Sequence, residues 1–337
     1  MPTAARASLY RGTSRNLARL ARALQRGELV AVPTETVYGL AADALNPRAC
    51  RKIFQAKGRP SNDPLIVHIE RLSQLDALAE RNEAVDRLAA KFWPGPLTLV
   101  LPKKSCVPAI VTSGQPSVAL RMPSHPLFRK LLRACGRPLA APSANPFGYI
   151  SPTTAEHVLE SLGQKIRFIL DGGPSAIGLE STILDLRNPA RPTLLRPGAI
   201  ARSELETVLG RRVFTLKLRK TPTTAAVVAP GLLSKHYSPR TPLVLHPRLR
   251  PSAVRNATTQ EVFVFQRRPR LAPGASAPAN VCWLSDEGDL GEAAHALFAT
   301  LRRLDRAGWK KIHAELAPGK SALALAINDR LGRAAAR

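Results

Sequence analysis

The 337-residue sequence is poor in cysteine, in aromatic side chains and in acids. Its four cysteines include no C-x-x-C pair, and no histidine stands at zinc-ligand spacing from two of them. This pattern argues against a zinc site and fits the reducing cytoplasm. No run of about eighteen apolar residues is present, so we expect no transmembrane helix and no membrane partner.

The shortage of acids leaves a strongly basic chain, with 50 Lys and Arg against 24 Asp and Glu and a formal net charge of +26. Such a surface attracts polyanions such as nucleotides or RNA, although a coding bias toward arginine explains the excess equally well. Arginines crowd the N-terminus before Glu28, as in a transit peptide. Leu17, Leu20 and Leu24 share one helical face, however, and Gly27 follows as a stop, which favours a first helix.

Short apolar runs alternate with helical patterns from Leu29 onward. Asn46 and Pro47 have the residue types of a helix cap and first turn, and a Trp-Pro-Gly-Pro segment at 93–96 ends a later helix abruptly. The predicted strands are 29–32, 65–69, 97–101, 118–121, 139–141, 166–170 and 182–186. This alternation predicts an α/β domain with a mixed sheet over residues 1–210.

Residues 211–242 contain no convincing core element, and we interpret them as an interdomain linker. A second alternating pattern follows over 243–337. Its predicted strands are 243–245, 262–265, 281–284 and 312–314, and its predicted helices are 290–304 and 321–331. The pattern favours a smaller α/β domain with a parallel sheet.

Several polar segments follow predicted strands, where ligands bind in α/β proteins. One is 33–39. Another, 140–145, carries Ser143 and Asn145, which face the same way if the segment is extended. Lys57 and Arg59 flank a glycine at a helix end, a position that suits cations through the helix dipole or as a phosphate clamp. Two further segments, 178–182 and 195–198, adjoin strands and are equally typical of surface turns.

Together these segments resemble the YrdC-like family, whose pattern is a K-x-R pair followed downstream by S-x-N. The matching stretches include PTETVYGL at 33–40, KIFQAKGRP at 52–60, WPGPLTLVL at 93–101, APSAN at 141–145 and LESTILDL at 179–186. HYSP at 236–239 and the trailing segment resemble the long, two-domain threonylcarbamoyl-AMP synthases. Two departures stand out: Asp63 replaces a frequent Asn, and 322–326 lacks the usual glycines.

The resemblance implies a YrdC-like twisted mixed-sheet domain, a linker folding over the active site, and a small Rossmann-like domain. It also implies a nucleotidyltransferase that converts L-threonine, bicarbonate and ATP into L-threonylcarbamoyl-adenylate and pyrophosphate. This is the first step of tRNA threonylcarbamoyladenosine modification. Mg²⁺ is expected to enter with ATP rather than through a protein metal site. The product is expected to pass to the tRNA threonylcarbamoyl transferase, with tRNA contacted through the basic surface.

The same resemblance implies the site residues. The expected catalytic residues are Lys57, Arg59, Ser143 and Asn145. The expected threonine-binding residues are Thr34, His68, Arg121, Ala141 and Ser181. The expected ATP-binding residues are Lys57, Ser61, Ser117, Ser143, Asn145, Ser151, Arg196 and Tyr237. His68 is nearly as well explained as a hydrogen-bonded core histidine.

Two other readings remain open from the sequence. The basic α/β domain could bind structured RNA through shape and phosphate contacts, without catalysis. Alternatively, the chain could be a related nucleotidyl or carbamoyl transferase that takes another amino acid.

Overall fold

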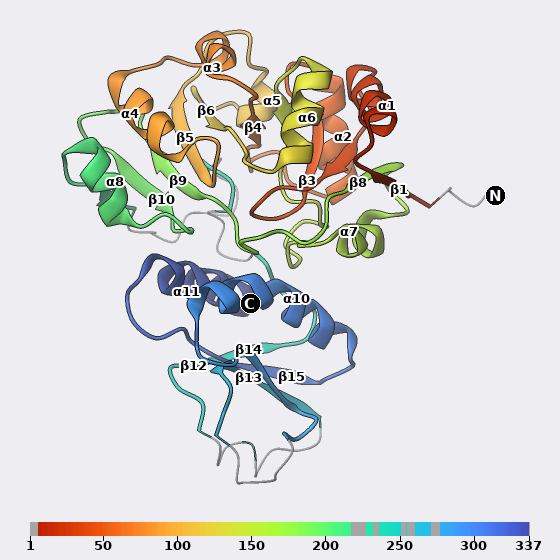
Figure 1. Ribbon diagram of the computed structural model, residues 1–337, viewed down its shortest axis with the longest axis vertical. Coiled ribbons are helices and arrows are strands. Elements are labelled where there is room, and N and C mark those ends of the chain that lie inside the picture. The colour runs from red at the N-terminus through yellow and green to blue at the C-terminus, as the bar shows by residue number, and fades with distance from the viewer. Residues whose placement is uncertain are drawn as a thin grey trace.

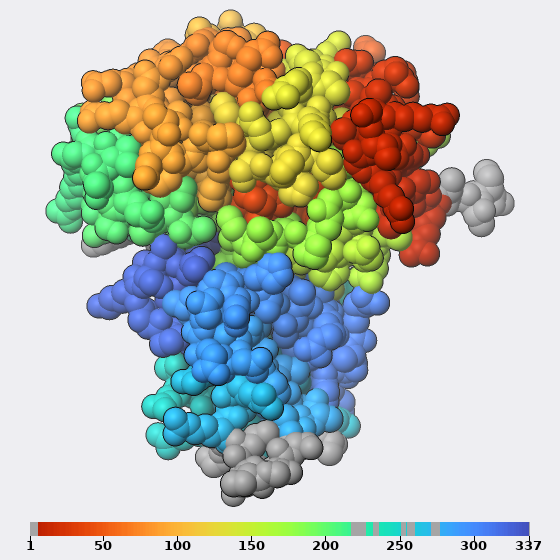
Figure 2. Space-filling view, viewed as in Figure 1, coloured from red at the N-terminus to blue at the C-terminus, as the bar shows by residue number. Residues whose placement is uncertain are grey.

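The computed structural model describes residues 6–216, 227–231, 236–250, 254, 260–270 and 277–336. They form two lobes, each built around its own sheet (Figure 1). The lobes are in direct contact (Figure 2). Among the described residues, no helix is both long and apolar enough to cross a membrane.

An eleven-stranded mixed sheet organises the first lobe, in the order β1-β8-β2-β3-β7-β4-β6-β5-β9-β10-β11. Its strands are β1 (Ser8–Arg11), β2 (Val30–Val32), β3 (Gly39–Asp43), β4 (Ile66–His68), β5 (Leu97–Pro102), β6 (Ser117–Arg121), β7 (Leu139–Ala140), β8 (Phe168–Asp171), β9 (Thr182–Asp185), β10 (Thr193–Arg196) and β11 (Phe214–Thr215). Its helices are α1 (Ser14–Gln25), α2 (Pro47–Lys57), α3 (Leu72–Leu78), α4 (Glu83–Phe92), α5 (Ala109–Thr112), α6 (Pro126–Cys135), α7 (Ala155–Leu162) and α8 (Arg202–Leu209).

The seven strands predicted for this lobe are all present, with ends that shift by up to two residues. The predicted first helix is also present as α1, and it buries Leu17, Leu20 and Leu24. Sequence reasoning missed β1, which precedes the first predicted strand, and β3, whose Gly-Leu-Ala-Ala-Asp run lacks the β-branched residues typical of strands. It also missed β11, which follows the predicted domain boundary at 210 and still pairs with β10.

Helix α2 positions the first pair of predicted site residues. The Asn46 side chain accepts hydrogen bonds from the main-chain N–H groups of Arg48 and Ala49, which caps the helix as predicted. The helix ends at Lys57, and Gly58 adopts a left-handed conformation with φ of 63°. This conformation suits glycine and turns the chain sharply between the two cations of the K-x-R pair.

The second lobe contains four parallel strands in the order β12-β15-β13-β14. Its strands and helices are β12 (Leu243–His246), β13 (Glu261–Arg267), β14 (Val281–Ser285), β15 (Lys311–Glu315), α10 (Leu290–Arg306) and α11 (Ala322–Ala335). The predicted parallel sheet and both predicted helices are thereby confirmed.

Helices α10 and α11 lie between the second sheet and the first lobe (Figure 1). Val37, Ile150 and Leu179 of the first lobe belong to the same buried apolar cluster as the inner faces of these helices. Arg302 on α10 is buried and donates to the main-chain oxygens of Ile150 at 2.5 Å and Ser151 at 3.3 Å. The interface between the lobes is therefore a continuous apolar core with buried hydrogen bonds, and not a hydrated polar contact.

Candidate functional site

A pocket in the first lobe collects side chains from several strand ends of the large sheet and from the segment that leads to the second lobe. The expected site residues that line it are Thr34, Arg59, His68, Arg121, Ala141, Ser143, Ser181, Arg196 and Tyr237. Three of these are buried arginines, whereas Glu180 is the one carboxylate among the lining residues that the structure describes. The pocket therefore favours an anionic ligand.

Lys57 holds the 143–145 loop through its ammonium group. Nζ donates to the main-chain oxygens of Ser143 at 2.6 Å and Asn145 at 2.5 Å. Burial lowers the pKa of Lys57 well below its usual value, and the neighbouring Arg59 adds to that effect. The sequence predicted a mobile point charge on phosphate, whereas the structure directs two of the three ammonium donors to a loop beside the pocket.

Arg59 faces the pocket, and its guanidinium is anchored from behind. Nη2 lies 2.9 Å from Oδ2 of Asp63, and both side chains are buried. The same guanidinium donates to the main-chain oxygens of Asp63 at 2.9 Å and Pro64 at 2.6 Å. The departure at Asp63 therefore supplies a counter-charge to Arg59. Burial raises the pKa of Asp63, and Arg59 opposes that rise.

Arg121 ends β6 and anchors the loop that follows β2. Its Nη2 lies 2.7 Å from Oε1 of Glu35, and its Nη1 donates to Oγ1 of Thr36 at 2.9 Å. The Glu35 contact is close, but it lacks hydrogen-bond geometry and leaves both carboxylate oxygens of Glu35 without a hydrogen-bond partner. We therefore treat it as a charge contact.

Thr34 and His68 support this end of the pocket in different ways. The Thr34 hydroxyl accepts from the N–H groups of Thr36 and Val37, both at 3.1 Å, which fixes the loop. His68 is 2 % exposed and its ring lies 5.4 Å from that of Phe128. Burial lowers the pKa of His68 to about 3, with the Arg121 charge as a smaller cause, so the imidazole is neutral at pH 7.

Arg196 links strand β10, Ser181 and the segment leading to the second lobe. Its guanidinium donates to the main-chain oxygen and the hydroxyl of Ser181, both at 3.1 Å, and to the main-chain oxygen of Pro230 at 3.3 Å. The Ser181 hydroxyl also lies 2.8 Å from that of Thr98. These contacts fix a buried cation at the pocket wall.

Tyr237 covers the pocket from the predicted linker. It is 1 % exposed, has a positive φ of 63°, and its ring lies 4.2 Å from that of His236. Within the described residues, the Tyr237 hydroxyl, Nδ1 of His236 and Oδ1 of Asn145 are buried without hydrogen-bond partners. Of these three residues, His236 and Tyr237 line the pocket, whereas Asn145 lies in the adjoining loop.

Five expected residues do not line the pocket: Lys57, Ser61, Ser117, Asn145 and Ser151. The Lys57 ammonium group donates to the main-chain oxygen of Asn145 in the adjoining loop, and the Ser151 hydroxyl donates to Oε1 of Glu180 at 2.6 Å. Ser61 is exposed, whereas Ser117 is buried at the start of β6, four residues before Arg121. Four strand residues span roughly 13 Å, which separates Ser117 from the pocket end of that strand.

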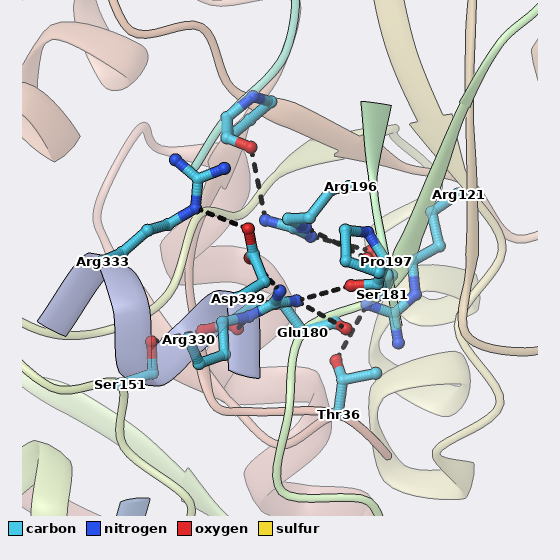
Figure 3. A network of polar contacts seen from close by, with 11 residues as sticks. Thr36, Arg121, Ser151, Glu180, Ser181, Arg196, Pro197, Asp329, Arg330 and Arg333 are labelled. Atoms are coloured by element: carbon cyan, nitrogen blue, oxygen red, sulfur yellow. Dashed lines mark hydrogen bonds and ion pairs between the residues drawn. The ribbon is translucent and has the colours of Figure 1, made fainter. Parts of the chain in front are cut away.

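Sequence reasoning named neither Thr36 nor Glu180 as a site residue, although both lie in segments that it singled out. Glu180 was not predicted to be a site residue, because a carboxylate would repel the phosphates expected nearby. The geometry explains its presence, because Glu180 contacts Ser151 and an arginine of the second lobe (Figure 3).

Comparisons with known proteins match both lobes. A family model described as telomere recombination (Sua5_yciO_yrdC) matches residues 22–198. A model described as the C-terminal domain of threonylcarbamoyl-AMP synthase matches residues 200–336. A threonylcarbamoyl-AMP synthase of Pyrococcus abyssi is 43% identical over 317 residues, covering 92% of this chain and 91% of that protein.

The chain belongs to the threonylcarbamoyl-AMP synthase family.

Two further matches support the long form of this family. The Bacillus subtilis threonylcarbamoyl-AMP synthase is 47% identical over 231 residues, which cover 68% of this chain and 66% of that protein. The crystal structure of P. abyssi Sua5 complexed with L-threonine superimposes with a TM-score of 0.86 at 39% identity, covering 97% of this chain and 96% of that one. The resemblance and the fold class predicted from the motifs are confirmed for both domains.

Proposed function

We propose that this chain converts L-threonine, bicarbonate and ATP into L-threonylcarbamoyl-adenylate and pyrophosphate. The observation that carries the proposal is the convergence of Arg59, Arg121 and Arg196 on one pocket under Tyr237, in a chain of this family. All the reactants are anionic or become so, and buried, pre-oriented cations offset their mutual repulsion. The chain is thus an enzyme of nucleotidyl transfer.

Threonine binds at the Arg121 end of the pocket. The guanidinium suits a carboxylate, since it presents paired N–H donors in a planar fork. Thr36 and the neutral His68 flank it and offer polar atoms for the hydroxyl or the amine. A relative crystallised with L-threonine has closely similar lobes, which supports threonine as the amino-acid substrate.

The nucleotide binds toward Arg59, Arg196 and Ser143, with Tyr237 above it. The nitrogen of the neutral threonine amine first bonds to the carbon of bicarbonate with loss of water, or to that of carbon dioxide with loss of a proton, and so forms a carbamate. A carbamate oxygen then attacks the α-phosphorus of ATP, the bond to the bridging oxygen breaks, and pyrophosphate leaves. The enzyme forms no covalent bond, so orientation and charge neutralisation supply the rate. A covered pocket keeps the anhydride from water.

Mg²⁺ enters this account with the ATP phosphates. The three carboxylates at or behind the pocket, Glu35, Asp63 and Glu180, each face an arginine at 2.7–2.9 Å. Metal ligation by these groups would require breaking those ion pairs. Mg²⁺ commonly binds through substrate phosphates with few protein ligands, and would here help to neutralise the triphosphate.

The proposal extends to the fate of the product. A mixed anhydride hydrolyses readily, so it must pass promptly to a transferase that carries the group to tRNA. The exposed arginines of α1, Arg15, Arg19 and Arg22, together with the net charge of +26, suit a tRNA contact. The four cysteines are free thiols, which suits a cytoplasmic setting.

The test is pyrophosphate release with ATP, in four reactions that contain or omit L-threonine and bicarbonate. We expect release only when both are present. Tight binding of structured RNA without any threonine-dependent release would instead favour the RNA-binding alternative. Equal release with an unrelated amino acid would favour a transferase of different specificity.

A further inference from the structure

Arg330 of the second lobe reaches the wall of the first lobe's pocket. Arg330 is 1 % exposed and stands on α11, about one and a half turns before the end of the helix at Ala335. Nε lies 2.7 Å from Oε2 of Glu180, which lines the pocket. Nη2 donates to the main-chain oxygen of Pro197 at 3.0 Å. Figure 3 shows the guanidinium directed from the helix toward these first-lobe groups.

Glu180 is held from both lobes at once. Its Oε2 faces Arg330, and its Oε1 accepts a hydrogen bond from the hydroxyl of Ser151 at 2.6 Å. The next residue, Ser181, carries the oxygens that fix the Arg196 guanidinium. A movement of Glu180 would therefore disturb both an expected nucleotide-binding serine and a pocket cation.

The same arginine supports the segment that covers the pocket. The guanidinium carbon of Arg330 lies 5.4 Å from the ring centroid of Tyr237, a cation–π contact. One turn later on α11, the main-chain oxygen of Arg333 accepts from the N–H of His236 at 3.4 Å. Helix α11 thus contacts the Tyr237 ring and the main chain of the preceding residue.

Charge explains why an arginine is needed here. The pocket is built for anions, and a bare carboxylate at its wall would repel them. Arg330 supplies the opposing charge to Glu180, and Asp329 in turn faces Arg330 and Arg333. Removal of Arg330 alone would leave Glu180 buried and uncompensated next to the ligand.

We propose that Arg330 is a positioning residue supplied by the second lobe, which neutralises Glu180 and orients Ser151 and Tyr237 for the nucleotide. The pocket is then complete only when the second lobe is docked. This inference rests on the proposed function, and it gives the second lobe a direct part in nucleotide binding.

The experiment compares Arg330→Met, Arg330→Lys, Glu180→Gln and the double variant with wild type. Steady-state pyrophosphate release gives kcat and the KM for ATP and for threonine, and calorimetry gives ATP affinity without turnover. We expect Arg330→Met to weaken ATP binding by about tenfold or more, with a smaller change for threonine. Glu180→Gln added to Arg330→Met should recover most of that loss, because the stranded charge is gone. Arg330→Lys should recover part of it.

Arg306→Ala is the control for loss of an inter-lobe ion pair as such, because Arg306 pairs with Glu160 across the same interface at a more exposed position away from the pocket. It should leave both KM values unchanged. Failure of Glu180→Gln to rescue Arg330→Met, or an equal effect of Arg306→Ala, would overturn the proposal. If Arg330→Met alone does not fold, Arg330→Lys and the double variant carry the comparison. A wild-type chain that binds ATP but releases no pyrophosphate contradicts the proposed function, while the affinities still test Arg330.

Discussion

Arg59 and Asp63 form a buried ion pair, with Nη2 2.9 Å from Oδ2, directly behind the pocket. The aspartate therefore does not compete with an anionic ligand as a free charge. It holds the guanidinium in place, with help from the main-chain oxygen of Pro64. In the K-x-R pair, Lys57 therefore holds a loop in place, whereas Arg59 lines the pocket and is held in position by Asp63.

We predict that Arg59→Ala is strongly destabilising as well as inactive. The change strands the Asp63 carboxylate in the interior, which typically costs about 3–5 kcal/mol. Adding Asp63→Asn should restore much of the stability, because the uncompensated charge is removed, but none of the turnover. Urea unfolding and pyrophosphate release measure the two effects. An Arg59→Ala protein as stable as wild type would show that the pair does not form.

We predict that Lys57→Met lowers turnover on the order of a hundredfold or more, in the range found for lost electrostatic stabilisation. Loss of the ammonium releases the carbonyls of Ser143 and Asn145 and removes a charge beside the pocket. Lys57→Arg should not rescue it, because a planar fork cannot replace a point donor between two carbonyls. Near-wild-type turnover in the arginine variant would contradict the bracing role.

We predict that threonine is preferred over both serine and valine. Serine lacks the methyl group, worth about 1 kcal/mol or somewhat more in an apolar pocket. Valine lacks the hydroxyl and leaves a buried polar group of the site unpaired. A panel of the three amino acids in the pyrophosphate assay measures kcat/KM for each. Equal values would exclude a threonine-shaped pocket.

We predict that His68 makes stability depend on pH. Its pKa is about 3 in the folded chain and 6.5 when unfolded, so below pH 6.5 the unfolded state binds a proton that the native state does not. The stabilisation is complete above pH 6.5 and is lost as the pH falls toward 3, at up to about 1.4 kcal/mol per pH unit. His68→Gln should flatten this slope in urea midpoints measured between pH 6 and 4. An unchanged slope would mean that His68 is protonated in the folded state.

Much of the fold was predictable because the local sequence patterns favoured the same helices and strands that the structure contains. The Asn46 cap, the Leu17–Leu24 face and the apolar strand runs each matched an element of the structure. Strand β3 was not predictable, because its small residues form a strand only by pairing with β2 and β7. Strand β11 is only two residues long and depends on β10.

The motifs predicted which residues belong to the candidate site, but not the contacts that those residues make. Nine of the expected residues line one pocket, yet no spacing rule indicated that Lys57 would bind loop carbonyls or that Asp63 would pair with Arg59. Arg330 lies about 150 residues from Glu180, and nothing in its own segment indicates a site. Such long-range pairings depend on how the lobes dock, which local patterns do not encode.

The most direct measurement is the identity of the product. The chain should be incubated with ATP, L-threonine and isotopically labelled bicarbonate, and the quenched nucleotides analysed by mass spectrometry. The account predicts an adenylate that contains threonine and one labelled carbon, formed in step with pyrophosphate. An adenylate that contains threonine without the label, or no threonine-dependent adenylate at all, would contradict it.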